Sequence, residues 1–191
     1  MALADPGAER RAAILAAATR VFLRYGFKKT SMDDLSRAAG LSRQGLYLHF
    51  PTKEALFKDA VSSLIATMRA EFHDALAKED VGIEERLVTA FEDAHAHAID
   101  AGAEHMNELL EAATALVGDE LCAMDEATVA DVARALSRSG VAARWKAAGV
   151  SAHALAAHLH ATSAGVKHLV ATQNEYRERM RIAVRIVCQG R

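Results

Sequence analysis

The first sixty residues alternate between apolar positions at helical spacing and short polar turns. One stretch places its apolar residues on a single helical face: Ile14, Ala17, Ala18, Val21, Phe22 and Tyr25. Gly26 follows this stretch, and glycine commonly ends helices because it readily takes the left-handed conformation. Thr30 and Ser31 then begin a second predicted helix, since Ser31-Met32-Asp33-Asp34 matches the capping-box pattern.

A third helix is predicted over Arg43–Phe50, with Ser42 as its cap and Pro51 as its end. A fourth helix begins after Thr52 and runs to about Lys78. The turn Gly40-Leu41 joins the second and third helices, which is the arrangement of a helix-turn-helix unit. We expect a small apolar core to fix the crossing of these two helices: Leu35, Ala39, Leu41, Leu46 and Phe50.

The rest of the chain is also predicted to be helical. The sequence holds 42 alanines and two prolines, and alanine has the highest helix propensity while proline has the lowest. Breaks are predicted at 80–82, 101–102, 117–119, 139–140, 149–151 and 172–174. The expected fold class is all-α. A disordered tail at 1–8 precedes a three-helix helix-turn-helix domain at 9–56 and a larger helical C-terminal domain at 57–191.

Charge divides the chain unevenly. Residues 1–60 carry ten basic and six acidic residues, a net +4, whereas the other 131 carry 13 basic and 19 acidic, a net −6. This asymmetry indicates an anionic partner for the N-terminal part. Residues 147–166 hold no Asp, Glu, Lys or Arg, but Ser, Thr and His interrupt them, so we predict a buried soluble helix and no membrane span.

Candidate DNA-binding chemistry lies on the outside of the third helix. In a helix-turn-helix unit the second helix enters the major groove of DNA. Arg43 and Gln44 can bond bidentately to guanine and adenine. Gly45 weakens a helix by roughly 1 kcal/mol relative to alanine, which favours a close approach of the backbone to the duplex. Three nearby side chains can donate to phosphates: Tyr47, His49 and Lys53.

The segments Gly26–Leu35 and Ala38–Phe57 resemble the N-terminal domain of the TetR (tetracycline repressor-like) family of bacterial transcription regulators. The resemblance covers about residues 10–60 without a gap. It implies base contacts from Arg43, Gln44 and Gly45. It implies phosphate contacts from Lys28, Lys29, Thr30, Ser42, Tyr47, His49 and Lys53. Two alternatives stay open: Thr30 is only a helix cap, and His49 is a half-buried residue that packs on the fourth helix.

A two-fold homodimer is expected, because a short recognition helix reads only a few base pairs. The last helix carries apolar residues on two faces, with Ile182 and Ile186 nearly opposite the other stripe. The resemblance also implies a four-helix interface from the last two helices. The interface residues we expect are Leu155, His158, Leu159, Thr162, Val166, Met180, Val184 and Val187. The alternative is burial of these helices within a monomer.

The resemblance further implies a ligand pocket in the C-terminal domain. Candidates combine apolar and polar side chains: Met68, Phe72, Phe91, His95, Met106, Glu108 and Trp145. The alternative for each is a core position, since aromatic residues and methionines at helical spacing mostly pack inside.

Other chemistries find little support. Cys122 and Cys188 lie far apart in sequence, which favours free thiols in a reducing cytoplasm. No apolar leader follows Met1, so a cytoplasmic location is expected. His153 and His160 share a helical face, but no HExxH or Glu-x-x-His motif occurs, so we expect no metal, no cofactor and no enzymatic activity.

The sequence therefore predicts a cytoplasmic homodimeric transcription regulator that binds double-stranded DNA at a palindromic operator. Repression is the sign expected from the resemblance, with release by a small apolar or amphipathic ligand, and activation stays open. One alternative is a helical enzyme or metal-binding protein that carries a helix-turn-helix head. Another is a DNA-binding adaptor that responds to no ligand.

Overall fold

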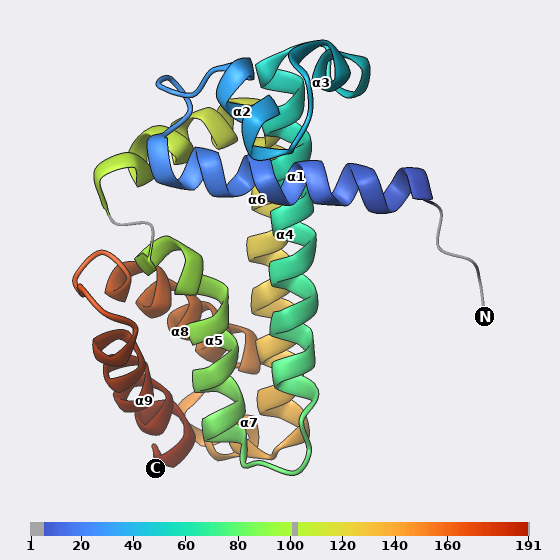
Figure 1. The fold of residues 1–191 in the computed structure, drawn as a ribbon. Coiled ribbons are helices and arrows are strands. Elements are labelled where there is room, and N and C mark those ends of the chain that lie inside the picture. The colour runs from blue at the N-terminus through green and yellow to red at the C-terminus, as the bar shows by residue number, and fades with distance from the viewer. Residues whose placement is uncertain (1–5, 101–102, 191) are drawn as a thin grey trace. The chain divides into compact units, whose positions relative to one another are not determined.

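The computed structural model describes residues 6–100 and 103–190, and within these ranges it contains helices and no strand (Figure 1). The all-α prediction is therefore confirmed for this part of the chain. The helices are α1 (Pro6–Tyr25), α2 (Met32–Ala38), α3 (Arg43–His49), α4 (Lys53–Ala77), α5 (Ile83–Asp100), α6 (Ala103–Arg138), α7 (Val141–Arg144), α8 (Ala152–Val166) and α9 (Gln173–Gln189). A short 3-10 turn, Lys146–Ala148, follows α7. The side chains of residues 96–106 lie outside the description.

The chain forms two compact units. The first unit comprises Met1–Ala66 and Glu104–Leu121, and the second comprises Thr67–Ala103 and Cys122–Arg191. Helices α4 and α6 each contribute to both, so the division falls later than the predicted boundary at residue 56 and adds part of α6 to the first unit. Helix α1 begins at Pro6, so positions 6–8 of the predicted tail are helical, while positions 1–5 lie outside the described residues.

Helix α1, the two short helices α2 and α3, and the start of α4 enclose the core of the first unit. Leu35, Leu46 and Phe50 are buried as predicted, while Ala39 and Leu41 are half-buried. The ring of Phe57 meets the ring of Phe22 edge-on at 4.9 Å and that of Phe27 at 4.8 Å between centroids. Each such buried side chain contributes about 1.5–3 kcal/mol. This core fixes how α2 and α3 cross.

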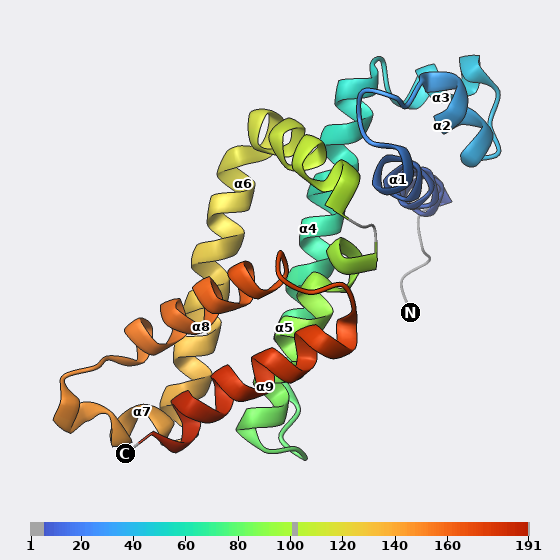
Figure 2. The same cartoon turned by 90° about the vertical axis from the view of Figure 1, so that its left-hand side faces the viewer.

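Helix α9 is the organising element of the second unit. It packs on α5 and also lies beside α8, which runs in the opposite direction (Figure 2). Residues of α4 and α6 join those of α5, α8 and α9 in one core: Phe72, Leu87, Val88, Phe91, Val132, Leu136, Leu155, Leu159, Tyr176, Met180, Val184 and Val187. Trp145 secures the end of α9, because its indole N–H donates to the Val187 carbonyl at 2.8 Å.

Most predicted breaks coincide with loops or caps. Gly26 and Gly40 take φ of +79° and +65°, which glycine adopts without a steric cost, and they end α1 and α2. The break predicted at 117–119 is instead a kink within α6, where Val117 leaves helical geometry with φ −140° and ψ 29°. The break predicted at 101–102 lies outside the described residues.

Candidate nucleic-acid interface

The predicted base-reading residues lie at the N-terminus of α3, which is held by a helix cap and a buried leucine. The Ser42 hydroxyl caps the helix and accepts a hydrogen bond from the Gly45 N–H at 3.0 Å. Leu46 faces inward and is fully buried, whereas Arg43 and Gln44 are exposed on the outer side. The structure therefore places both side chains where a DNA base could reach them.

Arg43 is held between two neighbours. One of its guanidinium nitrogens lies 3.3 Å from a carboxylate oxygen of Asp33 on α2. Its guanidinium carbon stands 5.7 Å from the ring centre of Tyr47, one helical turn away. The hydrogen bond with Tyr47 and then the charge of Asp33 raise the pKa of Arg43. Because Asp33 lies ten residues earlier and meets Arg43 only through the packing of α2 on α3, sequence reasoning did not identify it as part of the site.

Leu48 is a second residue that sequence reasoning missed. It lies on α3 beside the predicted contacts and is 84% exposed, although an apolar side chain of this size is usually buried. An exposed leucine on a recognition helix can contact the methyl group of thymine. No signal in the sequence singled it out, because a leucine on this helix resembles a core residue until the burial of Leu46 and Phe50 is known.

Two of the predicted phosphate contacts have other partners in this structure. Thr30 is only 3% exposed, and its hydroxyl donates to the Gly26 carbonyl at 2.6 Å. The cap of α2 is Ser31, so the structure gives Thr30 neither the phosphate role nor the cap role. The Lys53 ammonium donates to the carbonyls of Phe27 at 2.9 Å and Thr30 at 3.1 Å. Lys53 therefore ties the loop before α2 to α4.

The other predicted phosphate contacts remain accessible. Lys28, Lys29, Ser42 and Tyr47 are exposed. The backbone N–H of Lys28 is not free, because it donates to Glu108 Oε1 at 2.5 Å. His49 is half-buried, as its alternative predicts, but its ring neighbour is Phe50 at the end of α3, 6.5 Å away between ring centres, so packing on α4 stays a prediction.

The predicted pocket residues do not form one group. Glu108 belongs to the first unit, where it binds the loop before α2. Phe72 and Phe91 meet edge-on at 5.5 Å in the core of the second unit, and Met68 is half-buried. Trp145 is engaged with α9. The side chain of Met106 lies outside the described residues.

His95 is part of a buried polar network that sequence reasoning did not predict. Its Nε2 lies 2.9 Å from Ser163 Oγ, which in turn lies 2.6 Å from the Tyr176 hydroxyl. Burial, followed by the positive charges of Lys167, His160 and His168, lowers the pKa of His95 to about 3. His95 is therefore neutral at physiological pH.

The residues predicted for the dimer interface divide into two sets. Six of them lie in the core of the second unit: Leu155, Leu159, Val166, Met180, Val184 and Val187. Because a side chain buried in its own chain cannot also face a partner, these six are corrected to core residues. His158 is exposed and Thr162 is half-buried. The free apolar face of α9 is the opposite one, where Ile182 and Ile186 are 63% and 61% exposed.

Among the described residues, no cluster of three or more His, Cys, Asp or Glu side chains has the arrangement of a metal site. None of the helices in these ranges has the length and apolar character needed to cross a membrane.

Comparison with known proteins identifies the N-terminal part of the chain. Residues 14–60 match the family model for bacterial regulatory proteins of the tetR family. The HTH-type transcriptional regulator EthR of Mycolicibacterium smegmatis is 40% identical over 70 residues, which cover 37% of this chain and 32% of that protein. The HTH-type transcriptional repressor ComR of Escherichia coli is 32% identical over 81 residues, which cover 42% of this chain and 39% of that protein.

The fold is shared over nearly the whole length. A TetR-like transcriptional regulator from Rhodococcus sp. RHA1 has a TM-score of 0.65 at 22% identity, covering 98% of this chain and 100% of that one. The curated relatives above match only about a third of their own length, whereas the structural match includes both units. Residues 14–60 therefore match the model for bacterial regulatory proteins of the tetR family, and the likeness over the whole chain is one of fold.

Proposed function

We propose that this protein is a sequence-specific DNA-binding transcriptional regulator that binds a palindromic operator as a homodimer. The observation that carries the proposal is the capped N-terminus of α3, which exposes Arg43 and Gln44 above the buried Leu46. Arg and Gln side chains discriminate guanine and adenine by paired hydrogen bonds. Repression is the proposed sign, and the similarity of the N-terminal part to the repressor ComR supports it.

Phosphate contacts orient the recognition helix on the duplex. The exposed Lys28 and Lys29 precede α2, and the Ser42 hydroxyl keeps its proton free to donate while it caps α3. Lys53 acts indirectly, since its ammonium fixes the loop that carries the two lysines. Such contacts set position and affinity, and the bases set specificity.

A second copy of this chain is the proposed occupant of the free faces of α8 and α9. On α8 the exposed residues Ala154, His158, Ala161 and Gly165 recur at helical spacing and permit a close approach of another helix. On α9 the exposed Ile182 and Ile186 supply apolar area to bury. Two-fold pairing of these faces would present two recognition helices to one palindrome.

We further propose a cytoplasmic location and release from DNA by a small apolar or amphipathic ligand. The proposed contacts in the second unit are Met68, Phe72, Phe91 and His95. Support comes from the His95 network, which places polar groups within an otherwise apolar core. Binding sites for small ligands commonly combine an apolar lining with a few such groups.

The experiment that tests the function is selection of binding sites from random double-stranded DNA by the purified protein at low salt. We expect enrichment of one inverted repeat. Replacement of Arg43 by Ala should weaken binding to the selected repeat by about 1–3 kcal/mol and relax one base position. Arg138→Ala, a charge change at an exposed site of the second unit, serves as the control and should leave binding unchanged. Failure to enrich any sequence would contradict the proposal.

A further inference from the structure

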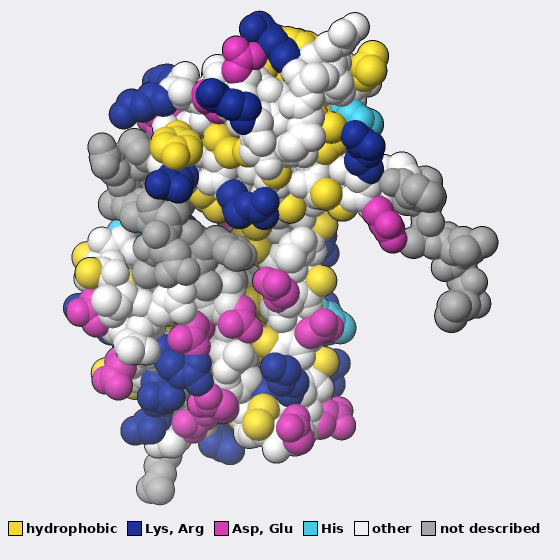
Figure 3. Space-filling model, in the orientation of Figure 1, with side chains coloured by type: hydrophobic (Ala, Val, Ile, Leu, Met, Phe, Trp, Pro, Cys, Tyr) yellow, Lys and Arg dark blue, Asp and Glu magenta, His cyan; other side chains and the backbone are white. Residues whose placement is uncertain are grey.

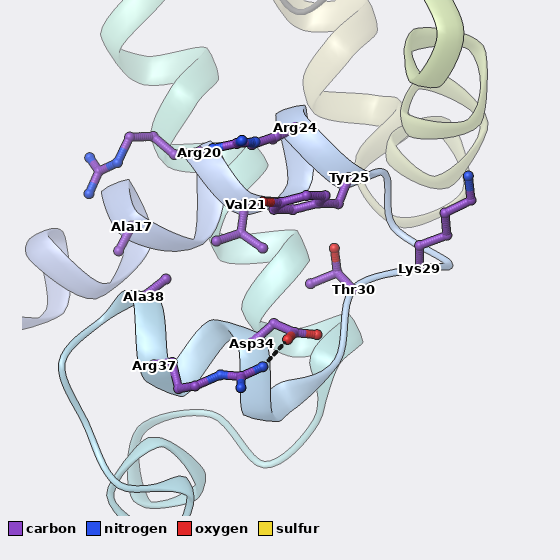
Figure 4. A pocket seen from close by; sticks show the side chains of 10 residues that line it. All are labelled: Ala17, Arg20, Val21, Arg24, Tyr25, Lys29, Thr30, Asp34, Arg37 and Ala38. Atoms are coloured by element: carbon purple, nitrogen blue, oxygen red, sulfur yellow. Dashed lines mark hydrogen bonds and ion pairs between the residues drawn. The ribbon is translucent and has the colours of Figure 1, made fainter.

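A groove of about 620 Å³ lies between α1 and α2 in the first unit (Figure 4). Its floor is apolar and is formed by Ala17, Val21 and Ala38. Four basic residues line its edges: Arg20 and Arg24 from α1, Lys29 from the loop, and Arg37 from α2. None of the three on α1 and α2 was among the predicted site residues.

The groove carries an excess of positive charge. Asp34 is the single carboxylate among its lining residues. That carboxylate is already engaged, because it completes the capping box with Ser31 and pairs with Arg37. Within the described ranges, no ion pair neutralises Arg20, Arg24 or Lys29, although the Arg24 guanidinium lies 5.2 Å from the Tyr25 ring centre. In Figure 3, Lys and Arg side chains gather over α1 and α2 on this face.

The spacing of these charges suits an extended anion. Arg20 and Arg24 are one turn apart on α1, a rise of about 6 Å, and like charges at this spacing oppose each other unless an anion lies between them. Double-stranded DNA carries a phosphate about every 3.4 Å along each strand, so one strand can meet several of these cations in succession. Guanidinium groups also bind phosphate oxygens in pairs.

The position of the groove connects it to the recognition surface. Lys29 lines the groove and also lies in the loop that precedes α2, where backbone contacts are proposed. From Lys29 the row of cations continues along α1 through Arg24 to Arg20. We propose that this groove binds the phosphodiester backbone of DNA that flanks the half-site read by α3. The proposal rests on the proposed DNA-binding function and extends it to base pairs outside the operator.

The test compares two DNA lengths. One duplex ends at the selected inverted repeat, and the other extends it by about eight base pairs of arbitrary sequence on each side. The native protein should bind the longer duplex about tenfold more tightly at low salt, because more phosphates release counterions. The double variant Arg20→Ala/Arg24→Ala should lose this gain, and its salt slope on the longer duplex should fall by about 4, because the proposed homodimer loses four cations. On the short duplex its affinity should remain within about twofold of the native value.

A matched control removes the same charge elsewhere. Arg138→Ala/Lys146→Ala changes two exposed basic residues of the second unit and should retain the gain from flanking DNA. Circular dichroism should show that both double variants are folded, because all four side chains are exposed. The proposal is overturned if the groove variant still binds the longer duplex more tightly than the shorter one by the native factor. It is also overturned if the variant loses the same affinity for both duplexes.

A small phosphate-bearing ligand is the competing occupant. Two results together would favour that ligand and overturn the proposal. Inorganic pyrophosphate would raise the melting temperature of the native protein but not of the groove variant, and the native protein would bind both duplexes with equal affinity. A protein that binds neither duplex contradicts the DNA-binding function itself, which is a separate result from loss of the flanking gain alone.

Discussion

The pairing of Arg43 with Asp33 gives a residue-scale prediction about discrimination. Asp33 holds the guanidinium in place and also repels phosphates near the recognition helix. Replacing Asp33 by Asn should therefore raise affinity for non-operator DNA about two- to fivefold, as expected for an exposed charge, and reduce the preference for the operator. Competition binding with both DNAs measures the ratio.

Glu54→Gln is the control for this prediction, because it removes the same charge from an exposed site in the first turn of α4. It should raise affinity for both DNAs alike. If Asp33→Asn and Glu54→Gln changed the ratio of operator to non-operator affinity equally, Asp33 would contribute only its charge. In the background of Arg43→Ala, Asp33→Asn should no longer change the ratio.

The burial of Thr30 and the exposure of Leu48 could not be predicted from the sequence. The recognition helix, its cap and its exposed Arg43 and Gln44 follow from local spacing alone. The burial of Thr30 depends on Gly26 and on Lys53, and a lysine 23 residues away cannot be placed by local pattern. Leu48 looks like a core residue by type, and only the packed helix shows that it is 84% exposed.

At the scale of elements, Lys53 connects the loop before α2 to the start of α4. Its ammonium makes two hydrogen bonds to carbonyls in a half-buried setting. Hydrogen bonds from charged donors contribute about 1.5–3 kcal/mol each, and partial exposure to water weakens these two, so Lys53→Ala should lower the free energy of unfolding by roughly 2 kcal/mol. Urea denaturation measures this, and Lys58→Ala, an exposed change on α4, should cost less than about 0.5 kcal/mol. Similar losses for both variants would contradict the connecting role.

The faces of α8 and α9 provide a test of the homodimer. Replacing both Ile182 and Ile186 by Glu should give monomers of 20.5 kDa by light scattering while the helix content stays unchanged, since both side chains are exposed. Leu169→Glu alters an equally exposed apolar residue in the loop before α9 and should leave the dimer intact. A dimer that survives the double change would exclude this face. The sequence reveals two apolar faces on α9, but which one faces α5 is decided by packing.

For the molecule as a whole, the division of charge differs from the one along the sequence. The first unit includes Glu104–Leu121, which adds five acidic residues and no basic one. The first unit therefore holds ten basic and eleven acidic residues, so its net charge is −1 rather than +4. The proposed attraction to DNA would therefore come from local cations, such as Arg43 and those of the groove, and not from a net positive unit.

The half-buried His95 makes global stability depend on pH. Its pKa in the fold is about 3, below the value near 6.5 of an unfolded histidine, so the unfolded chain binds more protons between these values. Stability from this group is complete above pH 6.5 and should fall by on the order of 1 kcal/mol per pH unit as pH decreases toward 3. Thermal unfolding at pH 7 and 5 measures the loss. His95→Gln should lessen it, whereas the exposed His153→Gln should not.

The hydrogen bond from the Lys28 N–H to Glu108 has a consequence for the order in which the protein is made. The loop before α2 is complete only when a residue 80 positions later has been synthesised. Chains emerge from the ribosome N-terminus first, so the proposed DNA-binding segment emerges before Glu108, which supports its loop, has been synthesised. An isolated fragment of residues 1–66 would lack Glu108 altogether, so its loop before α2 should be less ordered than the same loop in the intact chain.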